Sequence, residues 1–265
     1  MNCAYVTTNL LDLWNQPQFN SERLSQLFFG EVVSLGKADN GYARVTQPDG
    51  YTGWADIRFL RPVKKSEADR YSKSMKHVVT TEKACLIRNG GLLSPAPHFL
   101  FYGTPVCVRS VRQGIAVCDL PDGSARRLRT RDLKPMVPIR GSHPTGTQVV
   151  REAKRFLGVP YLWGGISPAG FDCSGLVRTV LGRFGIYVPR DTKDQITIGV
   201  EVKRDAVRTG DLLFFKRHVG FAIGRDLIIH SSVGGSGVRV NSLKPGADDY
   251  RPDLDRDFAT ARRIL

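Results

Sequence analysis

An internal repeat is the feature that most constrains how the first half of this chain folds. When the 265-residue sequence is shifted against itself by 73 residues, residues 5–63 match residues 78–136 without a gap. YVTT then meets VVTT, LFFG meets LFYG, and one PDG meets another. Because glycines and turn residues match along with apolar ones, the pattern indicates two copies of one structural unit.

Each copy carries short runs of β-forming residues separated by turn signals. EVVSLGKADNGYARV in the first copy and TPVCVRSVRQGIAVCDL in the second are such runs, and DNG and PDG are typical turns. Closely spaced short strands favour small barrels, which leave no sheet edge exposed. The copies resemble bacterial Src-homology-3-like domains, most clearly at PDGYTGWADIRFL in the first copy.

The two copies differ at aromatic positions that are suited to ligand contact. Tyr51 and Trp54 of the first copy align with Ser124 and Arg127 of the second. We expect Trp54 to fill the core of the first barrel and Tyr51, at a turn, to project outward. The first copy therefore predicts a contact role, whereas the second predicts a spacer or a docking face.

The net charge of +14 is concentrated in the middle of the chain. Residues 61–140 carry 16 basic and 6 acidic side chains, whereas residues 1–60 carry 4 and 6. The densest basic run is RRLRTR. Basic patches can bind nucleic acid or another polyanion, but no aromatic residue interleaves with this run. We therefore expect no nucleic-acid partner.

No apolar segment approaches the length of a membrane span, so no membrane partner is expected. The start, MNCAYVTTNLLDLWNQ, has neither a basic leader nor a long apolar stretch. It predicts no signal peptide and a cytoplasmic location, unless the N-terminus has been trimmed. The five cysteines have no C-x-x-C spacing, which disfavours a zinc or redox site. Cys107 and Cys118 could face each other on adjacent strands, although a cytosolic disulfide would be unusual.

A different pattern begins at Thr147. TQVVREAKRFLGV has the apolar spacing of a helix, which Gly158 and Pro160 end. CSGLVRTVLGRFGI predicts a second helix that begins near Cys173. DLLFF, HVGFAIG and LIIHSS then predict three consecutive strands.

Cys173 lies between Asp172 and Ser174, on the first turn of the second predicted helix. The unpaired N–H groups and the dipole of a helix start favour a thiolate, so we expect a lowered thiol pKa. The same N–H groups can donate to a developing oxyanion. Cysteine catalysis also needs a base and a group that orients that base.

Two histidines are suitably placed for these roles. His218 begins the strand HVGFAIG and His230 is near the end of LIIHSS. Antiparallel strands joined by GRD would bring them side by side, with His218 as base and His230 as its orienting partner. A structural role for both stays open on these residues alone. No third ligand falls at a suitable spacing, so no metal site is predicted.

Six segments occur in the order and style of the NlpC-type cell-wall peptidases: YLWGG, FDCSG, VPRDTKDQ, GDLLFF, HVGFAIG and IIHSS. This resemblance covers roughly residues 147–265. It implies a cysteine peptidase with a compact papain-like fold and no cofactor. It also implies Cys173 as nucleophile, His218 as base and His230 as the third polar member.

With Src-homology-3-like barrels in front, the chain resembles the dipeptidyl-peptidase branch of that family. The resemblance implies cleavage of the bond between γ-D-glutamate and a diamino acid, diaminopimelate or lysine, in peptidoglycan (murein) stem peptides that have a free N-terminal L-alanine. Asp172 would bind the substrate ammonium, Tyr161 would assist the oxyanion, and Tyr51 would close the pocket's amino-terminal end. The other implied substrate-binding residues are Ser174, Arg190, Asp191, Thr192 and Glu31.

The sequence therefore predicts an α+β chain. Two small all-β Src-homology-3-like barrels at 1–63 and 78–140, joined by a linker at 64–77, precede a compact papain-like peptidase domain at 141–265. Two other functions stay open. One is a non-catalytic cell-wall or polyanion binding protein with a vestigial peptidase domain, which the basic second barrel motivates. The other is an amidase or acyltransferase on the same fold.

Overall fold

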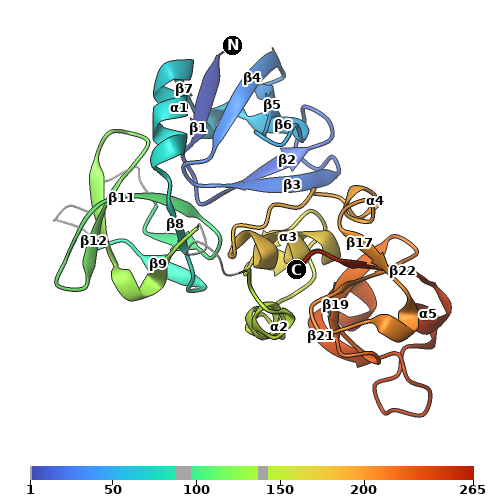
Figure 1. Cartoon of the computed structure of the whole chain (residues 1–265). Coiled ribbons are helices and arrows are strands. Elements are labelled where there is room, and N and C mark those ends of the chain that lie inside the picture. The colour runs from blue at the N-terminus through green and yellow to red at the C-terminus, as the bar shows by residue number, and fades with distance from the viewer. Residues whose placement is uncertain (1, 88–96, 137–142) are drawn as a thin grey trace. The chain divides into compact units, whose positions relative to one another are not determined.

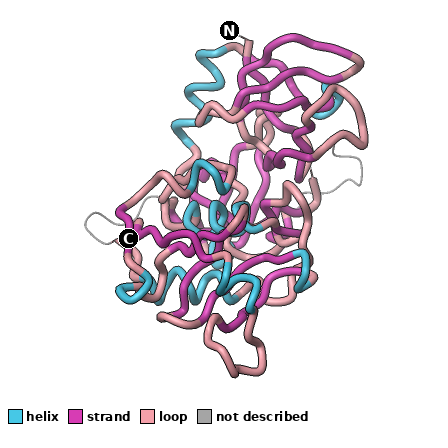
Figure 2. Tube along the Cα trace, turned by 90° about the vertical axis from the view of Figure 1, so that its right-hand side faces the viewer, coloured by secondary structure: helices cyan, strands magenta, loops and turns pink. Residues whose placement is uncertain are grey.

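The structure is a computed structural model that describes residues 2–87, 97–136 and 143–265. It divides into a first unit, Met1–Val137, and a second unit, Pro138–Leu265 (Figure 1). Strands and loops make up most of the described chain, with short helices among them (Figure 2). The chain is thus a mixture of helices and strands, as predicted. The predicted boundary between residues 140 and 141 lies outside the described residues.

The first copy of the repeat forms one antiparallel sheet of seven strands. The order in the sheet is β3-β2-β6-β5-β4-β1-β7, so β3 and β7 lie at its edges. The expected closed barrel is therefore not present among the described strands, because these two edges do not pair. The elements are β1 (Cys3–Val6), β2 (Leu10–Trp14), β3 (Arg23–Phe28), β4 (Val32–Asp39), β5 (Tyr42–Thr46), β6 (Thr52–Asp56), η1 (Ile57–Phe59) and β7 (Leu60–Val63).

The second copy repeats this order of elements. Its strands lie in the order β13-β12-β11-β8-β14, which matches the order β6-β5-β4-β1-β7 of the first copy, and β10 pairs separately with β9. The internal repeat is thus confirmed element by element. The elements are β8 (His77–Val79), β9 (Lys83–Cys85), β10 (Phe99–Phe101), β11 (Pro105–Arg112), β12 (Ile115–Asp119), β13 (Ala125–Arg129), η2 (Thr130–Asp132) and β14 (Leu133–Pro135).

One cross-strand position marks where the copies differ. Trp14 pairs with Trp54 and so joins β2 to β6 in the first copy. The residues 73 positions later, Ile87 and Arg127, form only an isolated bridge. The second copy therefore keeps the contact between its two sheets but lacks the aromatic pair.

The side chains of β6 and the preceding turn point in directions opposite to those expected. Gly53 and Ala55 are buried, and Trp54 between them is only half-buried. Tyr51 packs against the core of the first copy, and its hydroxyl donates to the Leu24 carbonyl at 3.4 Å. Both expectations are wrong because successive strand residues face opposite sides of the sheet. Tyr51 shares the side of Gly53 and Ala55.

Residues 64–77, the predicted linker, contain a packed helix, α1 (Lys65–Ser74). Ala68 is fully buried. The rings of Tyr71 and Tyr5 meet edge to face with centroids 5.1 Å apart, and the Tyr71 hydroxyl donates to the Asp119 carbonyl at 3.4 Å. Because Tyr5 lies in the first copy and Asp119 in the second, α1 connects the two copies within the first unit.

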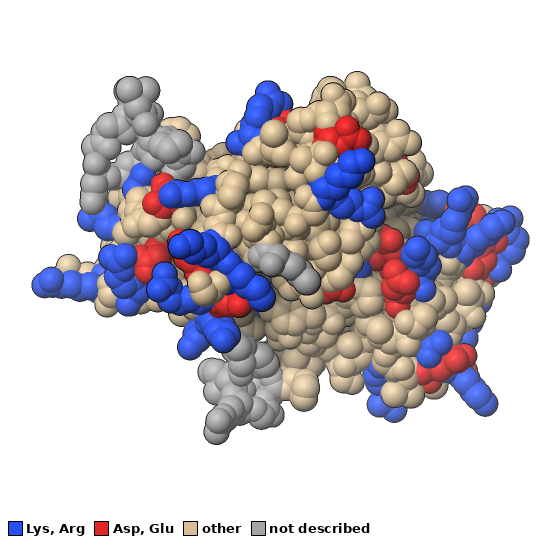
Figure 3. Space-filling view, turned by 90° about the horizontal axis from the view of Figure 1, so that it is seen from above, with Lys and Arg blue, Asp and Glu red and all other residues tan. Residues whose placement is uncertain are grey.

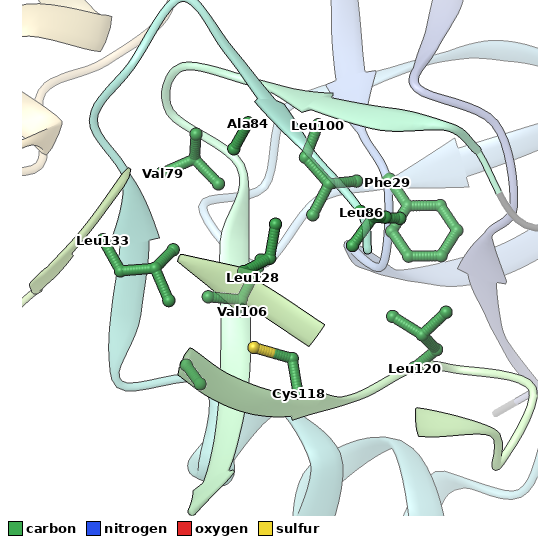
Figure 4. Close-up of a cluster of buried hydrophobic side chains, with 11 residues drawn as sticks. Phe29, Val79, Ala84, Leu86, Leu100, Val106, Cys118, Leu120, Leu128 and Leu133 are labelled. Atoms are coloured by element: carbon green, nitrogen blue, oxygen red, sulfur yellow. The ribbon is translucent and has the colours of Figure 1, made fainter. Parts of the chain in front are cut away.

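The core of the second copy also receives a side chain from the first. Phe29, which directly follows β3, lies beside Leu86 in this cluster (Figure 4). The two copies therefore share apolar packing. The buried members of the cluster are Phe29, Val79, Ala84, Leu86, Leu100, Val106, Ala116, Cys118, Leu120, Leu128 and Leu133.

Cys107 and Cys118 do not face each other. Cys118 pairs with Val108 across β11 and β12, whereas Cys107 pairs with Asp119. Adjacent positions of a strand point to opposite faces of the sheet, so the two thiols lie on opposite sides. Both are free cysteines.

Basic side chains are exposed along the strands of the second copy. Arg109 and Arg112 on β11, and Arg127 and Arg129 on β13, are all exposed. In the space-filling view, Lys and Arg side chains project from the surface at the left, with acidic residues among them (Figure 3). The charge excess of the middle segment is therefore carried on the protein surface.

The second unit is built on one antiparallel sheet in the order β17-β22-β18-β19-β20-β21. The two helices and three consecutive strands expected here are confirmed. The helices of the unit are α2 (Gly146–Lys154), α3 (Cys173–Gly182), α4 (Thr192–Gln195) and α5 (Pro252–Arg256). The strands and short turns are β15 (Ile166–Ser167), β16 (Gly170–Phe171), β17 (Val200–Val202), η3 (Arg204–Ala206), β18 (Leu212–Phe215), β19 (His218–Ile223), β20 (Leu227–Ser232), η4 (Val233–Gly235), β21 (Gly237–Ser242) and β22 (Phe258–Arg263).

Both faces of this sheet are covered. Leu213 and Phe215 of β18 share an apolar cluster with Leu254 of α5. The helices α2 and α3 contact β19 and β20. LLFF is buried at all four positions of β18, as a strand covered on both faces requires. Among the described helices, none combines the length and apolar character of a membrane span.

Candidate active site

The start of α3 is fixed by one carboxylate. Asp172 is the N-cap of this helix, and its Oδ1 accepts from the Gly175 N–H at 2.6 Å. Its Oδ2 accepts from the Gly164 N–H at 2.9 Å. A side chain at Gly175 would place Cβ 2.1 Å from the Gly165 carbonyl oxygen, so the turn packs directly on the helix. Cys173, the first residue of α3, is held between these contacts.

Arg190 lies against the same carboxylate. Its two terminal nitrogens lie 3.2 Å from Oδ1 and 2.5 Å from Oδ2 of Asp172, and one of them also donates to the Ser174 hydroxyl at 2.9 Å. The Arg190 side chain is only 1% exposed. In this structure the guanidinium holds Asp172 and Ser174 from inside the protein. The contact with substrate that the resemblance implies for Arg190 stays a prediction.

This pairing also bears on the implied ammonium site. The two oxygens of Asp172 accept from two backbone N–H groups, the Ser174 hydroxyl and the Arg190 guanidinium. A carboxylate offers about four lone-pair positions, and these donors fill them. In this structure the contacts of Asp172 cap the helix and hold Arg190. The ammonium contact that the resemblance implies for Asp172 stays a prediction.

Cys173 is 9% exposed as a residue, and its thiol is surrounded by hydrogen-bond donors. Its sulfur lies 3.7 Å from the Thr192 hydroxyl, at the start of α4. Burial, and then the Asp172 carboxylate, raise the thiol pKa above its ordinary value. Hydrogen bonds from Thr192 and from the N–H groups of Val219 and Ser174 act in the opposite direction. The expected lowering is therefore wrong, because burial and the Asp172 carboxylate outweigh the hydrogen bonds to the sulfur.

The two predicted imidazoles lie in contact, as expected. Nε2 of His218 is 2.7 Å from Nδ1 of His230, and the rings are nearly perpendicular, at 79°. His230 is fully buried, and His218 is half-buried. A side chain at Gly220 would place Cβ 2.8 Å from the Cβ of His230, so glycine there leaves room for the ring pair. The Val219 N–H donates a hydrogen bond to the Cys173 sulfur, so the start of β19 lies beside the thiol.

Sequence reasoning missed Asn241, which continues the hydrogen bonds from His218 to His230. Nε2 of His230 lies 2.9 Å from Oδ1 of Asn241 on β21, and Nδ2 of Asn241 donates to the Asp249 carbonyl at 3.1 Å. His230 pairs with Arg239 across β20 and β21, so Asn241, two residues further, shares its face. The alternation in GVRVNS predicts a strand, but only the strand register places Asn241 beside His230.

Both imidazoles are neutral at neutral pH. Burial lowers the pKa of His218 to about 3 and that of His230 to about 4. The positive charge of Arg251 lowers both pKa values further, and the Asp253 carboxylate acts against it. Burial therefore favours the uncharged form of the thiol and of both imidazoles.

Tyr161 is half-buried in the same unit. Burial raises its pKa, as do the neighbouring Cys173 and Asp172, so its hydroxyl stays protonated and can donate. Asp191 is half-buried and directly precedes α4. Within the described parts of the chain, no three His, Cys, Asp or Glu side chains form a group suited to a metal ion.

Tyr51 and Glu31 belong to the first unit, and Cys173 belongs to the second. Glu31 is half-buried directly before β4, and its N–H donates to the Phe28 carbonyl at 3.2 Å. The roles in substrate binding that the resemblance implies for Tyr51 and Glu31 stay predictions.

Two segments of the chain match known families. Residues 158–250 match the NlpC/P60 family, and residues 13–58 match the bacterial dipeptidyl-peptidase Sh3 domain. The chain is 37% identical to the γ-D-glutamyl-L-lysine dipeptidyl-peptidase of Bacillus subtilis, over 83% of this chain and 75% of that protein. It is 35% identical to a protein of the same name from Bacillus cereus, over 97% and 83%.

A solved structure is similar along the whole chain. The crystal structure of an NlpC/P60 family protein from Bacillus cereus superposes with a TM-score of 0.84 at 25% identity and covers 99% of both chains. The chain therefore belongs to the NlpC/P60 family. It is a cysteine peptidase, a hydrolase, that carries a bacterial SH3 domain near its N-terminus.

We expect Arg190→Met to lower the free energy of unfolding by about 3–5 kcal/mol, because it leaves the Asp172 carboxylate buried without its partner. Urea denaturation measures this loss. Arg256→Met is the matched control in the same unit: its ion pair with Asp257 is largely exposed, so its loss should change the free energy of unfolding only slightly. Equal costs for the two variants would contradict the structural role of Arg190.

We expect the free energy of unfolding to fall as the pH drops below about 6.5, the ordinary histidine pKa. Because both imidazoles have lowered pKa values in the folded protein, the unfolded chain binds more protons in this range. The slope should approach about 1.4 kcal/mol per pH unit for each ring. Urea denaturation across this range measures it, and His230→Gln should reduce the slope. An unchanged slope in that variant would show that His230 is not buried as a neutral ring.

Proposed function

We propose that this protein cleaves the bond between γ-D-glutamate and a diamino acid in peptidoglycan stem peptides that have a free N-terminal L-alanine. The observation that carries the proposal is a buried thiol at a capped helix start, in the same unit as a hydrogen-bonded imidazole pair. The similarity to two γ-D-glutamyl-L-lysine dipeptidyl-peptidases, over most of both chains, supports the substrate class.

In the proposed mechanism, Cys173 is the nucleophile and His218 the base. Nε2 of His218 is engaged with His230, so its Nδ1 is the nitrogen that accepts the thiol proton. The sulfur attacks the γ-carbonyl carbon and forms a C–S bond, and the C–N bond to the diamino acid breaks. The His218 imidazolium returns its proton to the leaving amine. A water molecule, deprotonated by His218, then hydrolyses the thioester and releases the dipeptide and the free thiol.

The pKa directions at the site determine when the proton moves. Burial raises the pKa of the Cys173 thiol and lowers that of His218, so both groups are neutral before attack. Proton transfer therefore accompanies attack on the carbonyl, as in general base catalysis. The N–H groups at the start of α3 and the protonated Tyr161 hydroxyl are the proposed donors to the oxyanion. Thr192 donates to the sulfur while it is negatively charged.

Recognition of the substrate amino group rests on the resemblance. It is proposed for Asp172, whose oxygens also accept from backbone N–H groups and from Arg190 in this structure. Tyr51, as the residue that closes the amino-terminal end of the pocket, and Glu31 are the further candidates. The other proposed substrate-binding residues are Ser174, Tyr161, Arg190, Asp191 and Thr192.

We also propose that the second copy of the repeat is a second SH3-like domain and that the second unit is papain-like. The first part is supported by the matched order of elements in the two copies. The second part is supported by α3 packing on an antiparallel sheet, with the thiol at the helix start.

Cleavage of defined peptides tests the proposed function. We expect the wild type to release L-Ala-γ-D-Glu from L-Ala-γ-D-Glu-diaminopimelate or from the lysine tripeptide, and not from the N-acetylated forms. Cys173→Ala should lower the rate by at least about 10³-fold, because the nucleophile is lost. Mass spectrometry of the products measures the rate. Cys85→Ala, which removes an exposed cysteine of the first unit, is the matched control and should keep full activity.

Three outcomes would contradict this function. If the wild type cleaves none of these peptides, or Cys173→Ala cleaves them fully, the peptidase mechanism is wrong. Salt-sensitive binding to sacculi without any hydrolysis would favour a wall-binding protein, which the exposed arginines of the second copy suggest. Transfer of the dipeptide to an added amine in place of water would favour an acyltransferase.

A further inference from the structure

We propose that Asn241 is a positioning residue that sets which nitrogen of each active-site imidazole carries its hydrogen. The inference rests on the proposed function, in which His218 is the base. The six sequence motifs end at IIHSS and do not include Asn241. Asn241 reaches the site through the register of β20 and β21, where it pairs with Ile228.

The orientation of the Asn241 amide is fixed on its far side. Asn241 is 3% exposed, and its Nδ2 donates to the Asp249 carbonyl at 3.1 Å. A carbonyl only accepts, so the amide nitrogen must face Asp249 and the amide oxygen must face His230. The Asp249 carbonyl is itself held, because the Ser242 N–H donates to it at 3.1 Å and Ser242 bridges to Tyr250.

The amide oxygen then sets the tautomers of both rings. Oδ1 of Asn241 only accepts, so Nε2 of His230 must carry a hydrogen. Because His230 is buried and neutral, its Nδ1 has no hydrogen and accepts from Nε2 of His218. The neutral His218 ring then has its lone pair on Nδ1. This is the nitrogen that the proposed mechanism needs as base.

Without the amide oxygen, two neutral rings joined by one hydrogen bond have a second arrangement. His230 can donate from Nδ1 to Nε2 of His218, which moves the other hydrogen of the pair onto Nδ1 of His218. A ring in that form cannot accept the thiol proton at Nδ1. Asn241 excludes this arrangement, because it would turn the bare Nε2 of His230 toward the amide oxygen.

The charged groups around the pair do not select a tautomer. Arg251 and Asp253 act on both rings, and Arg239 acts on His230. These charges change how readily a ring takes up a second proton. They make no hydrogen bond to either ring among the described contacts, whereas Asn241 does. The choice between the two neutral forms is therefore assigned to Asn241.

The direct test is the ¹⁵N chemical shifts of the two imidazoles in the full-length protein at about pH 7, where the rings are neutral. In the wild type we expect Nδ1 without hydrogen and Nε2 with hydrogen in both rings. Asn241→Leu, which removes the acceptor at similar size, should show both arrangements or the reverse one. Asn241→Asp keeps an acceptor toward His230 but loses the donor to Asp249, so it should keep the hydrogen on Nε2 of His230.

Kinetics provide the second readout. Asn241→Leu should lower kcat for the stem tripeptide about 10- to 100-fold with KM nearly unchanged, and Asn241→Asp should restore most of the loss. Thr179→Val is the matched control, because it removes another buried hydrogen bond of the second unit, from Oγ1 to the Ile166 carbonyl at 2.7 Å, in which neither ring takes part. It should lower stability without changing the ¹⁵N pattern or kcat.

Several results would overturn the proposal. If Nε2 of His230 has no hydrogen in the wild-type protein, the proposal is overturned before any variant is made. This outcome holds even if Asn241→Leu fails to fold. A wild-type ¹⁵N pattern in Asn241→Leu, or a loss of kcat no larger than that of Thr179→Val, does so as well. If the enzyme cleaves none of the peptides, the ¹⁵N pattern still decides the role of Asn241 and separates it from the proposed function.

Discussion

The buried carboxylate of Asp172 is the interaction on which the candidate site depends. It joins the glycine-rich turn at Gly164, the start of α3 at Gly175 and the guanidinium of Arg190. A buried charge of this kind is tolerated only while its partners stay in place, so the three segments are held together. Cys173, the residue that follows, therefore has its backbone fixed before any substrate arrives. The negative charge of the same carboxylate, together with burial, raises the pKa of the thiol. The sulfur therefore has to be ionised during attack.

A second row of contacts prepares the base. Hydrogen bonds run from the Asp249 carbonyl through Asn241 and His230 to His218. Burial keeps both rings neutral, and each acceptor along the row determines the hydrogen position of the next group. In our account the protein therefore preorganises a neutral thiol and a neutral base. In this account no thiolate–imidazolium pair forms before substrate binds, and the proton moves from Cys173 to His218 during the chemical step.

The sequence predicted what depends on local pattern and missed what depends on register and burial. The repeat was predictable because glycines and turns recur at a fixed offset, and the structure confirms it element by element. Tyr51 packs against the core and Trp54 is only half-buried, the reverse of what was predicted. The sequence does not show which face of β6 meets the core, because that depends on how the strand pairs. Arg190 and Asn241 could not be placed from sequence, since their partners lie 18 and 11 residues away on other elements. The prediction that the thiol pKa of Cys173 is lowered was wrong, because the burial that raises this pKa is a property of the folded chain.

The central claim is that the sulfur of Cys173 forms a covalent bond with the γ-glutamyl carbonyl. The most direct measurement is intact and peptide mass spectrometry of the wild-type enzyme, acid-quenched during turnover of the stem tripeptide. Our account predicts a mass increase equal to an L-Ala-γ-D-Glu acyl group, located on the peptide that contains Cys173 and labile to hydroxylamine. Two results would contradict it. One is an adduct on any residue other than Cys173. The other is turnover without an adduct, when the same method does detect the acyl-enzyme that a slowly deacylating ester forms.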